Sequence, residues 1–293
     1  MSADPDWSLY RTLLAVMDDG SLSGAARRLG LTQPTVARHV ETLETALGAD
    51  LFVRSQRGLA PTDLARSLRP HAETIAASAA ALLRTASGTT GEVTGIVRIN
   101  ASEVVGVEYL PPILTQLRRE HPRLTVELVL TDRVDDLLRR DADIAVRNTE
   151  PTQGSLLARR LSAIELGFHA HRDYLERRGT PASIQNLADH DLIGFDVETP
   201  MLRAMLAHLP GLDRRSFALR TDSNLAQLAA LRAGFGIGVC QAALGRRDPL
   251  LTRVLDDVAF PLPLWVAMHE DLKTSARYRL VFDALVDALG TAV

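Results

Sequence analysis

The chain has 293 residues, about twice the length of a common single domain, which favours two or more domains over one core. Apolar residues make up 46% and charged residues 24%, a globular composition that excludes a generally disordered or fibrous chain. The longest strongly apolar run, residues 75–83, is far shorter than the roughly 20 residues needed to cross a bilayer. We therefore expect no membrane span.

Compartment and metal chemistry are indicated by two features. Residues 1–7 contain two acids and neither a basic segment nor an apolar stretch, so they do not resemble a secretory signal. The single cysteine, Cys240, can form neither an internal disulfide nor a thiolate metal cluster. The sequence predicts a cytoplasmic protein with no metal site and no cofactor.

Charge is unevenly distributed along the chain. The formal net charge is −3, yet residues 21–69 hold seven arginines against four acids. Because nearly every basic residue of the chain is arginine, arginine abundance alone is weak evidence for a nucleic-acid partner. The N-terminal part is nevertheless built differently from the remainder.

Two short helices are predicted at the start of the chain. Apolar residues at near-helical spacing indicate the first over residues 7–18. Ser21 is a good N-cap for a second over residues 22–29, and Gly30 follows as its C-terminal stop.

A third helix follows directly, capped by Thr32 and running to Gly48. Its apolar positions recur at helical spacing and should all face inward: Val36, Val40, Leu43 and Leu47. The residues of the opposite side and of the N-terminal tip are Gln33, Pro34, Thr35, Ala37, Arg38, Thr42 and Thr45. A helix, a tight turn and a second helix exposing Gln, Thr and Arg at its start form a helix-turn-helix, in which Arg can pair with guanine and Gln with adenine.

A β-hairpin is predicted after the third helix. Residues 51–54 and 59–60 flank a Ser-Gln-Arg-Gly turn, which places Arg54 and Arg57 near DNA phosphates. The whole is a winged helix-turn-helix. The alternative on pattern alone is a small helical bundle without a ligand.

Sequence motifs extend across this region in a fixed order. The run GSLSGAARRLGLTQPTVAR covers residues 20–38, and Leu-Glu, Leu-Gly, Leu-Phe-Val-Arg and Pro-Thr follow at residues 43, 47, 51 and 61. Residues 7–68 closely resemble, without a gap, the DNA-binding domain of LysR-type transcriptional regulators. Two departures are Ala37, where the family usually has serine, and Leu64-Ala65, where Ala-Gly is common. The first could alter base or phosphate contacts.

The resemblance implies that the tip of the third helix approaches base edges and that Arg54 holds the DNA backbone. The candidate DNA-contacting residues are Ser23, Gln33, Pro34, Thr35, Ala37, Arg38, Arg54 and Arg57. For Arg38 the alternative is a solvated surface arginine paired with Glu41 or Glu44. For His39 a packing role has as much support as a DNA role.

One long helix is predicted from Thr62, its cap, to about residue 85, and nothing in the chain obviously covers its apolar face. The resemblance implies an antiparallel dimer of this linker helix, and a tetramer, so that two recognition helices read a two-part site in double-stranded promoter DNA. RNA polymerase is a further candidate partner. The predicted domains are the winged helix-turn-helix at 1–61, the linker at 62–87 and an effector domain at 88–293.

Strands and helices alternate in the remaining chain, which predicts α/β architecture with mainly parallel sheets. The predicted strands are 96–99, 126–130, 144–146, 165–170, 192–193, 217–219, 237–240 and 264–268. The predicted helices are 110–119, 134–140, 173–178, 201–206, 225–233 and 276–289. This part resembles the two-lobed, periplasmic-binding-protein-like effector domain of the same family, with lobe I at about 92–161 and 266–293 and lobe II at about 162–265.

In open α/β sheets, ligands bind at the carboxyl ends of strands, near helix N-termini that favour anions. This rule selects Asn100, Ser102, Glu103, Thr131, Arg147, Phe195, Asp222 and Ser223 as candidate effector-binding residues. Ser102 and Ser223 could instead be ordinary helix caps, and Arg147 could pair with an acid. The carboxylate of Glu103 would oppose an acidic metabolite, so the effector is expected to be neutral, amine-bearing or placed elsewhere.

Catalysis has no support in the sequence, which lacks a nucleophile elbow, a paired-histidine zinc motif, a phosphate-binding loop and a complete dinucleotide fingerprint. His169 and His171 share a strand face without a third ligand, and Cys240 is expected to be a buried small hydrophobe. The sequence thus predicts a DNA-binding transcriptional regulator that senses a small molecule. The alternative is a small-molecule-binding α/β protein with an N-terminal helical dimerisation module.

Overall fold

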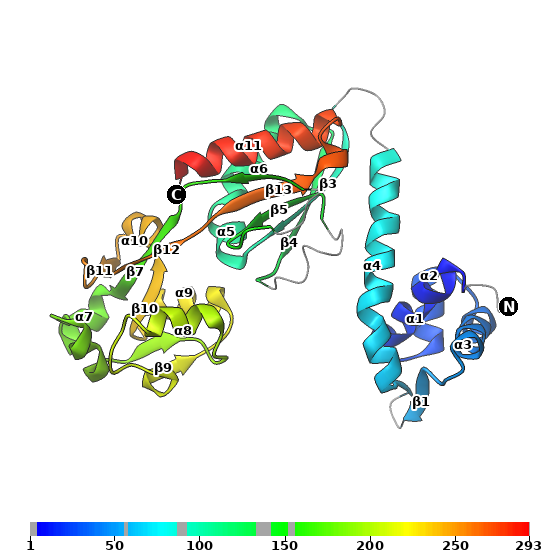
Figure 1. Cartoon of the computed structure of the whole chain (residues 1–293), viewed down its shortest axis with the longest axis horizontal. Coiled ribbons are helices and arrows are strands. Elements are labelled where there is room, and N and C mark those ends of the chain that lie inside the picture. The colour runs from blue at the N-terminus through cyan, green and yellow to red at the C-terminus, as the bar shows by residue number, and fades with distance from the viewer. Residues whose placement is uncertain (1–4, 56–57, 87–92, 133–141, 152–155, 293) are drawn as a thin grey trace. The chain divides into compact units, whose positions relative to one another are not determined.

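A computed structural model describes residues 5–55, 58–86, 93–132, 142–151 and 156–292. These residues form two compact units, which meet in the sequence between residues 86 and 87 (Figure 1). Within the described ranges, no helix has the length and apolar character to span a bilayer.

The first unit begins with the three predicted helices: α1 at Trp7–Asp19, α2 at Leu22–Leu29 and α3 at Gln33–Leu47. Ser21 and Thr32 cap α2 and α3, because each side-chain oxygen accepts a hydrogen bond from a backbone N–H two or three residues into the helix. Glycine in the left-handed conformation ends each helix. The predicted helices and caps are confirmed.

The predicted hairpin is also present. Strands β1 (Phe52–Ser55) and β2 (Gly58–Pro61) pair antiparallel. The hairpin is fastened to the turn between α1 and α2, since Leu59 N donates to Gly20 O at 2.8 Å. Gly58 has a φ of +120°, and a Cβ there would lie 2.5 Å from Gly20 O, so this position requires glycine.

The core of the first unit confirms three of the four inward-facing positions on α3. Val36, Val40 and Leu43 are buried, whereas Leu47 is 37% exposed. The prediction for Leu47 is wrong because it is the last residue of α3, next to the Gly48 cap, and belongs to neither apolar cluster of the unit.

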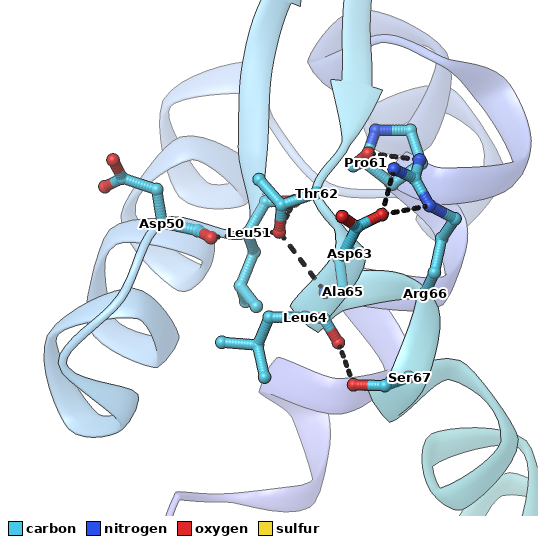
Figure 2. Close-up of polar contacts among 9 residues, drawn as sticks. All are labelled: Asp50, Leu51, Pro61, Thr62, Asp63, Leu64, Ala65, Arg66 and Ser67. Atoms are coloured by element: carbon cyan, nitrogen blue, oxygen red, sulfur yellow. Dashed lines mark hydrogen bonds and ion pairs between the residues drawn. The ribbon is translucent and has the colours of Figure 1, made fainter.

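The long helix is α4, at Asp63–Ala86. Figure 2 shows how its start is held: Thr62 Oγ1 lies 3.0 Å from Asp50 O and 3.2 Å from Leu51 O, and it accepts from Ala65 N at 3.3 Å. Arg66 donates to Asp63 Oδ1 at 2.7 Å and to Pro61 O at 2.5 Å. The predicted cap is therefore also the joint between the hairpin and the linker helix.

The second unit contains two sheets. The first has the order β4-β3-β5-β13-β6, from Leu124–Leu130, Gly95–Ala101, Ile144–Arg147, Trp265–His269 and Leu156–Arg160. The second has the order β11-β7-β10-β8-β9, with β12 also on β7; these strands are Leu251–Arg253, Ile164–His171, Ile237–Gln241, Leu192–Gly194, Phe217–Arg220 and Ala259–Leu262. The late strand β13 thus returns to the first sheet, as predicted.

The helices of this unit are α5 Glu103–Glu108, α6 Leu110–Glu120, α7 Arg172–Arg178, α8 Pro200–Leu206, α9 Asn224–Arg232, α10 Ala242–Arg247 and α11 Ala276–Ala292. Helices α6 and α11 pack on the first sheet, and α9 packs on strands of the second. The helix predicted at 134–140 and the domain boundary at 87–91 lie outside the described residues.

The prediction of mainly parallel sheets needs correction. Strands β4, β3 and β5 pair in parallel, as do β9, β8 and β10, but β13 is antiparallel to both of its neighbours and β7 to all three of its own. Both sheets are mixed because the segments that cross between the lobes, β7 and β13, enter each sheet from the opposite end.

Candidate functional site

The N-terminal tip of α3 presents polar side chains to solvent. Gln33, Pro34 and Arg38 are exposed, Thr35 and Ala37 are half-buried, and Ser23 is exposed near the start of α2, which packs on α3. Thr32 fixes the tip: its hydroxyl accepts from Thr35 N at 3.3 Å and lies 2.8 Å from Thr35 Oγ1. The outward face predicted for this helix is the face observed.

The side chain of Arg38 makes no ion pair or hydrogen bond with any described residue. The proposed surface partner Glu44 is occupied elsewhere, because its Oε1 accepts from Leu51 N at 2.7 Å and from Phe52 N at 3.4 Å. Glu44 therefore braces the start of the hairpin against α3. The brace spans only seven and eight residues, but periodicity and capping patterns do not predict a side chain that bonds backbone beyond the end of its own helix.

His39 and Arg54, the other two described residues weighed for a DNA role, have different surroundings. His39 is half-buried, and its Nδ1 lies 2.9 Å from Thr12 Oγ1 of α1, which favours the packing role. Arg54 is exposed on β1 without an ion-pair partner among the described residues. Arg57 lies outside the described residues.

An ion-pair network missed by sequence reasoning connects α1, α2 and α4. Asp18 accepts from Arg28 at 2.7 Å and from Arg69 at 2.6 Å, and Arg69 also bonds Glu73 at 2.7 Å. These carboxylates, and chiefly the hydrogen bond to Glu73, raise the pKa of Arg69. Asp18 thereby fixes the linker helix against the first two helices and leaves Arg28 and Arg69 partly neutralised.

The second candidate site lies at the carboxyl ends of three neighbouring strands. The register places Ala101 of β3 beside Leu130 of β4 and Val146 of β5, so Ser102, Thr131 and Arg147 follow at one sheet edge, directly after Asn100 and Ala101. Ser102 N donates to Val146 O at 3.2 Å, and Thr131 N donates to Ala101 O at 3.0 Å. The structure thus brings together four of the eight predicted effector residues.

Two side chains at this edge are buried without a partner. Asn100 is 3% and Ser102 is 6% exposed, and neither Asn100 Oδ1 nor Ser102 Oγ has a hydrogen-bond partner among the described residues. Ser102 is the N-cap residue of α5 but makes no side-chain capping bond, so the capping alternative fails for it. Arg147 is buried and donates to the carbonyl of Thr131.

Glu103 and Ser223 form a contact between the two lobes. Ser223 caps α9 by accepting from Ala226 N at 3.3 Å, and its hydroxyl donates to Glu103 Oε2 at 3.1 Å. Leu225 N donates to the same carboxylate oxygen at 3.3 Å. The capping alternative for Ser223 is therefore observed, and Glu103 points at the start of α9.

Phe195 and Asp222 lie in local structure of lobe II. Phe195 packs against the apolar core of that lobe, where it lines a small apolar cavity. Asp222 is exposed and its Oδ1 accepts from Asp196 N at 3.1 Å and Val197 N at 2.9 Å. Both contacts support a structural role.

A second inter-lobe contact, again missed from the sequence, joins the other ends of α5 and α9. Glu108 bonds Arg232 at 2.6 Å and 3.1 Å, and Arg232 also pairs with Asp248 at 3.3 Å. The hydrogen bond from Arg232 lowers the pKa of Glu108. Beside these polar contacts, Val105 and Tyr109 share an apolar cluster with Leu228 and Leu231.

The residues weighed for catalysis are packed as structural groups. His169 is 1% exposed, its Nδ1 lies 3.0 Å from Gly167 O, and burial lowers its pKa. His171 Nδ1 accepts from Asp173 N at 3.2 Å at the start of α7. Burial raises the pKa of Cys240 to about 12, as suits an inert thiol. Within the described ranges, no group of three potential metal ligands is found.

Comparison with known proteins gives two family matches. Residues 7–66 match the model of the bacterial regulatory helix-turn-helix protein, lysR family, and residues 90–290 match the LysR substrate binding domain. The transcriptional activator TtdR of Escherichia coli K12 is 26% identical, covering 95% of this chain and 93% of that protein.

Solved structures share the fold along nearly the full length. The structure of CrgA, a LysR-type transcriptional regulator from Neisseria meningitidis, has a TM-score of 0.59 at 24% identity and covers 97% of this chain and 99% of its own. Full-length CbnR in complex with its target DNA has a TM-score of 0.66 at 19% identity, covering 96% and 99% of the two chains.

Proposed function

The chain belongs to the LysR family of transcriptional regulators, with a helix-turn-helix domain and a substrate-binding domain, and we propose that it reads a two-part operator through the tip of α3. The observation that carries this proposal is the tip itself. Gln33 and Arg38 are exposed there, and Arg38 has no partner within the described part of the chain. An arginine free of ion pairs keeps its guanidinium available for a bidentate bond to guanine.

The hairpin and the third helix have complementary parts in this proposal. Arg54 on β1 neutralises a phosphate and sets the register, and the α3 tip discriminates bases. Affinity then depends steeply on salt, because phosphate neutralisation releases counterions.

Dimerisation through α4 provides the two half-sites. Leu64, Ile75 and Leu82 recur at spacings of eleven and seven residues, which places them on one stripe of the helix, and they are 37%, 41% and 70% exposed. Burying this stripe against a second copy would remove the exposed apolar side chains from water. CbnR, whose structure includes target DNA, has the same fold. Because a protein that regulates promoters must reach chromosomal DNA, the proposed location is the cytoplasm.

The second domain supplies the signal. A small-molecule effector binds near Asn100 and Ser102, whose buried oxygens lack partners among the described residues, and no cofactor or catalytic step is needed. The ligand must have different affinities for two arrangements of the regulator, since otherwise no equilibrium shifts.

The test is selection of genomic fragments by the purified full-length protein at near-physiological salt, followed by sequencing. Enrichment of an inverted repeat is the expected result. A folded, dimeric protein that enriches no sequence, with and without cell extract of small molecules, would contradict operator reading.

A further inference from the structure

The first turn of α9 is already occupied by groups of this chain. Leu225 N donates to Glu103 Oε2 at 3.3 Å, Ala226 N to Ser223 Oγ at 3.3 Å, and Gln227 N to Ser223 O at 3.1 Å. A helix start of this kind, facing the carboxyl ends of strands, is where an α/β domain ordinarily receives an anion. Here the carboxylate of Glu103, from the other lobe, takes that place.

A second carboxylate reinforces the arrangement. Asp132 Oδ1 accepts from Glu103 N at 3.2 Å, and its Oδ2 accepts from Asn224 Nδ2 at 2.7 Å. Two carboxylates therefore take up donors of both α5 and α9 at this edge. An anionic ligand group would be repelled by these carboxylates and would find the nearby N–H groups already hydrogen-bonded.

Two buried polar oxygens beside Glu103 lack a hydrogen-bond partner among the described residues. Ser102 precedes Glu103 directly, and its buried hydroxyl has no partner among the described residues; the same holds for the buried carbonyl oxygen of Asn100. The carbonyl oxygen can only accept a hydrogen bond, so it calls for a donor, while the hydroxyl can serve either role. Leaving both unsatisfied is costly, so a ligand or water that supplies a donor is favoured.

We propose that Glu103 is a specificity-determining residue that takes the place of an effector's acidic group at the start of α9, so that the effector is a non-acidic small molecule with a hydrogen-bond donor for Asn100. The proposal rests on the proposed function only in requiring that an effector exists. The role of Glu103 as a resident anion is a property of the second domain alone.

The test is chemical rescue with acetate in the full-length protein. Glu103→Ala removes the carboxylate and opens the space it fills, whereas Glu103→Gln keeps the space filled without a charge. Thermal unfolding of wild type and both variants is followed as acetate replaces chloride at constant ionic strength. We expect Glu103→Ala to have the lowest Tm and to recover it saturably with acetate, because a ligand that binds only the folded state stabilises it by mass action.

Wild type and Glu103→Gln should not respond to acetate beyond their response to chloride. A saturable response in wild type, or none in Glu103→Ala, would overturn the proposal. Operator binding is measured on the same preparations. If no variant, wild type included, selects a DNA sequence while Glu103→Ala still responds to acetate, then the proposed function fails and the resident anion stands.

Discussion

Helices α3 and α9 have the same kind of N-terminal cap, but the start of α3 is exposed and the start of α9 bonds another lobe of the protein. Thr32 and Ser223 each cap their helix with a hydroxyl that accepts from the N–H three residues on. At α3 the side chains of Gln33 and Arg38 are exposed and bond no described residue, whereas at α9 a carboxylate from the other lobe fills the first turn. A capped helix start becomes a binding surface or a structural joint according to what tertiary structure brings to it.

The largest expected effect comes from removing the packing that holds the α3 tip in place. Leu43 is 1% exposed in the cluster where α1, α3, the hairpin and α4 meet. Leu43→Ala should destabilise the first unit by about 2–5 kcal/mol, as cavity-forming core substitutions do. Trp7 reports this unit and Trp265 the second, so urea unfolding is followed by fluorescence in a Trp265→Phe background.

Leu47→Ala is the matched control on the same helix. Its side chain is 37% exposed, so the change in unfolding free energy should stay within about 0.5 kcal/mol. A loss equal to that of Leu43→Ala would mean that Leu47 is buried in the folded protein after all.

The second prediction concerns the free arginine of the α3 tip. Arg38→Ala should weaken operator binding by about 10- to 100-fold, corresponding to about 1–3 kcal/mol for a lost bidentate base contact, with a much smaller effect on scrambled DNA. Binding is measured by gel shift at one fixed salt concentration.

The control removes an equal charge from the second domain. Arg119 is exposed on α6 and has no ion-pair partner among the described residues. Arg119→Ala should leave operator affinity nearly unchanged. Equal losses for both variants would indicate that net charge, rather than the tip, determines binding.

The difference between α3 and α9 also explains which features of the structure could be predicted from the sequence. Helix bounds, caps and the outward face of α3 depend on residues within one or two turns, and the periodicity of Val36, Val40 and Leu43 was sufficient to orient it. The prediction for Leu47 was wrong because the apolar periodicity continues to the last residue of α3, whether or not an apolar cluster covers that end.

The contacts of α9 with α5 depend instead on residues 120 and more positions away in the chain. Ser223 meets Glu103 across 120 residues, and Arg232 meets Glu108 across 124. Strand-end reasoning selected both Glu103 and Ser223, which follow strands of different sheets, yet it could not say that they would bond each other. The bond between Asp132 and Asn224 was not predicted, because neither residue has a sequence feature that marks it other than lying next to a selected residue.

The third prediction tests the brace between α3 and the hairpin. Glu44 Oε1 accepts from Leu51 N at 2.7 Å, so Glu44→Ala should cost about 1–3 kcal/mol by leaving that amide unsatisfied. Glu44→Gln retains a carbonyl acceptor and should lose less. Both are measured by Trp7 fluorescence as above, and the opposite order of the two variants would contradict the brace.

The smallest expected effect lies at the far ends of α5 and α9, and it depends on pH. The hydrogen bond from Arg232 holds the pKa of Glu108 below its ordinary value of 4.5, so the pair stabilises the fold above pH 4.5 and loses that contribution as the pH falls below it. Because Arg232 is 38% exposed, the contribution at pH 7 should be no more than about 1 kcal/mol. The Tm difference between wild type and Glu108→Gln should therefore be largest near neutrality and shrink towards zero in acid.

Glu176→Gln is the control, at an exposed residue of α7 with no ion pair among the described residues, and it should show no such trend. A Tm difference for Glu108→Gln that stays constant with pH would mean that the α5–α9 joint depends on its apolar packing alone.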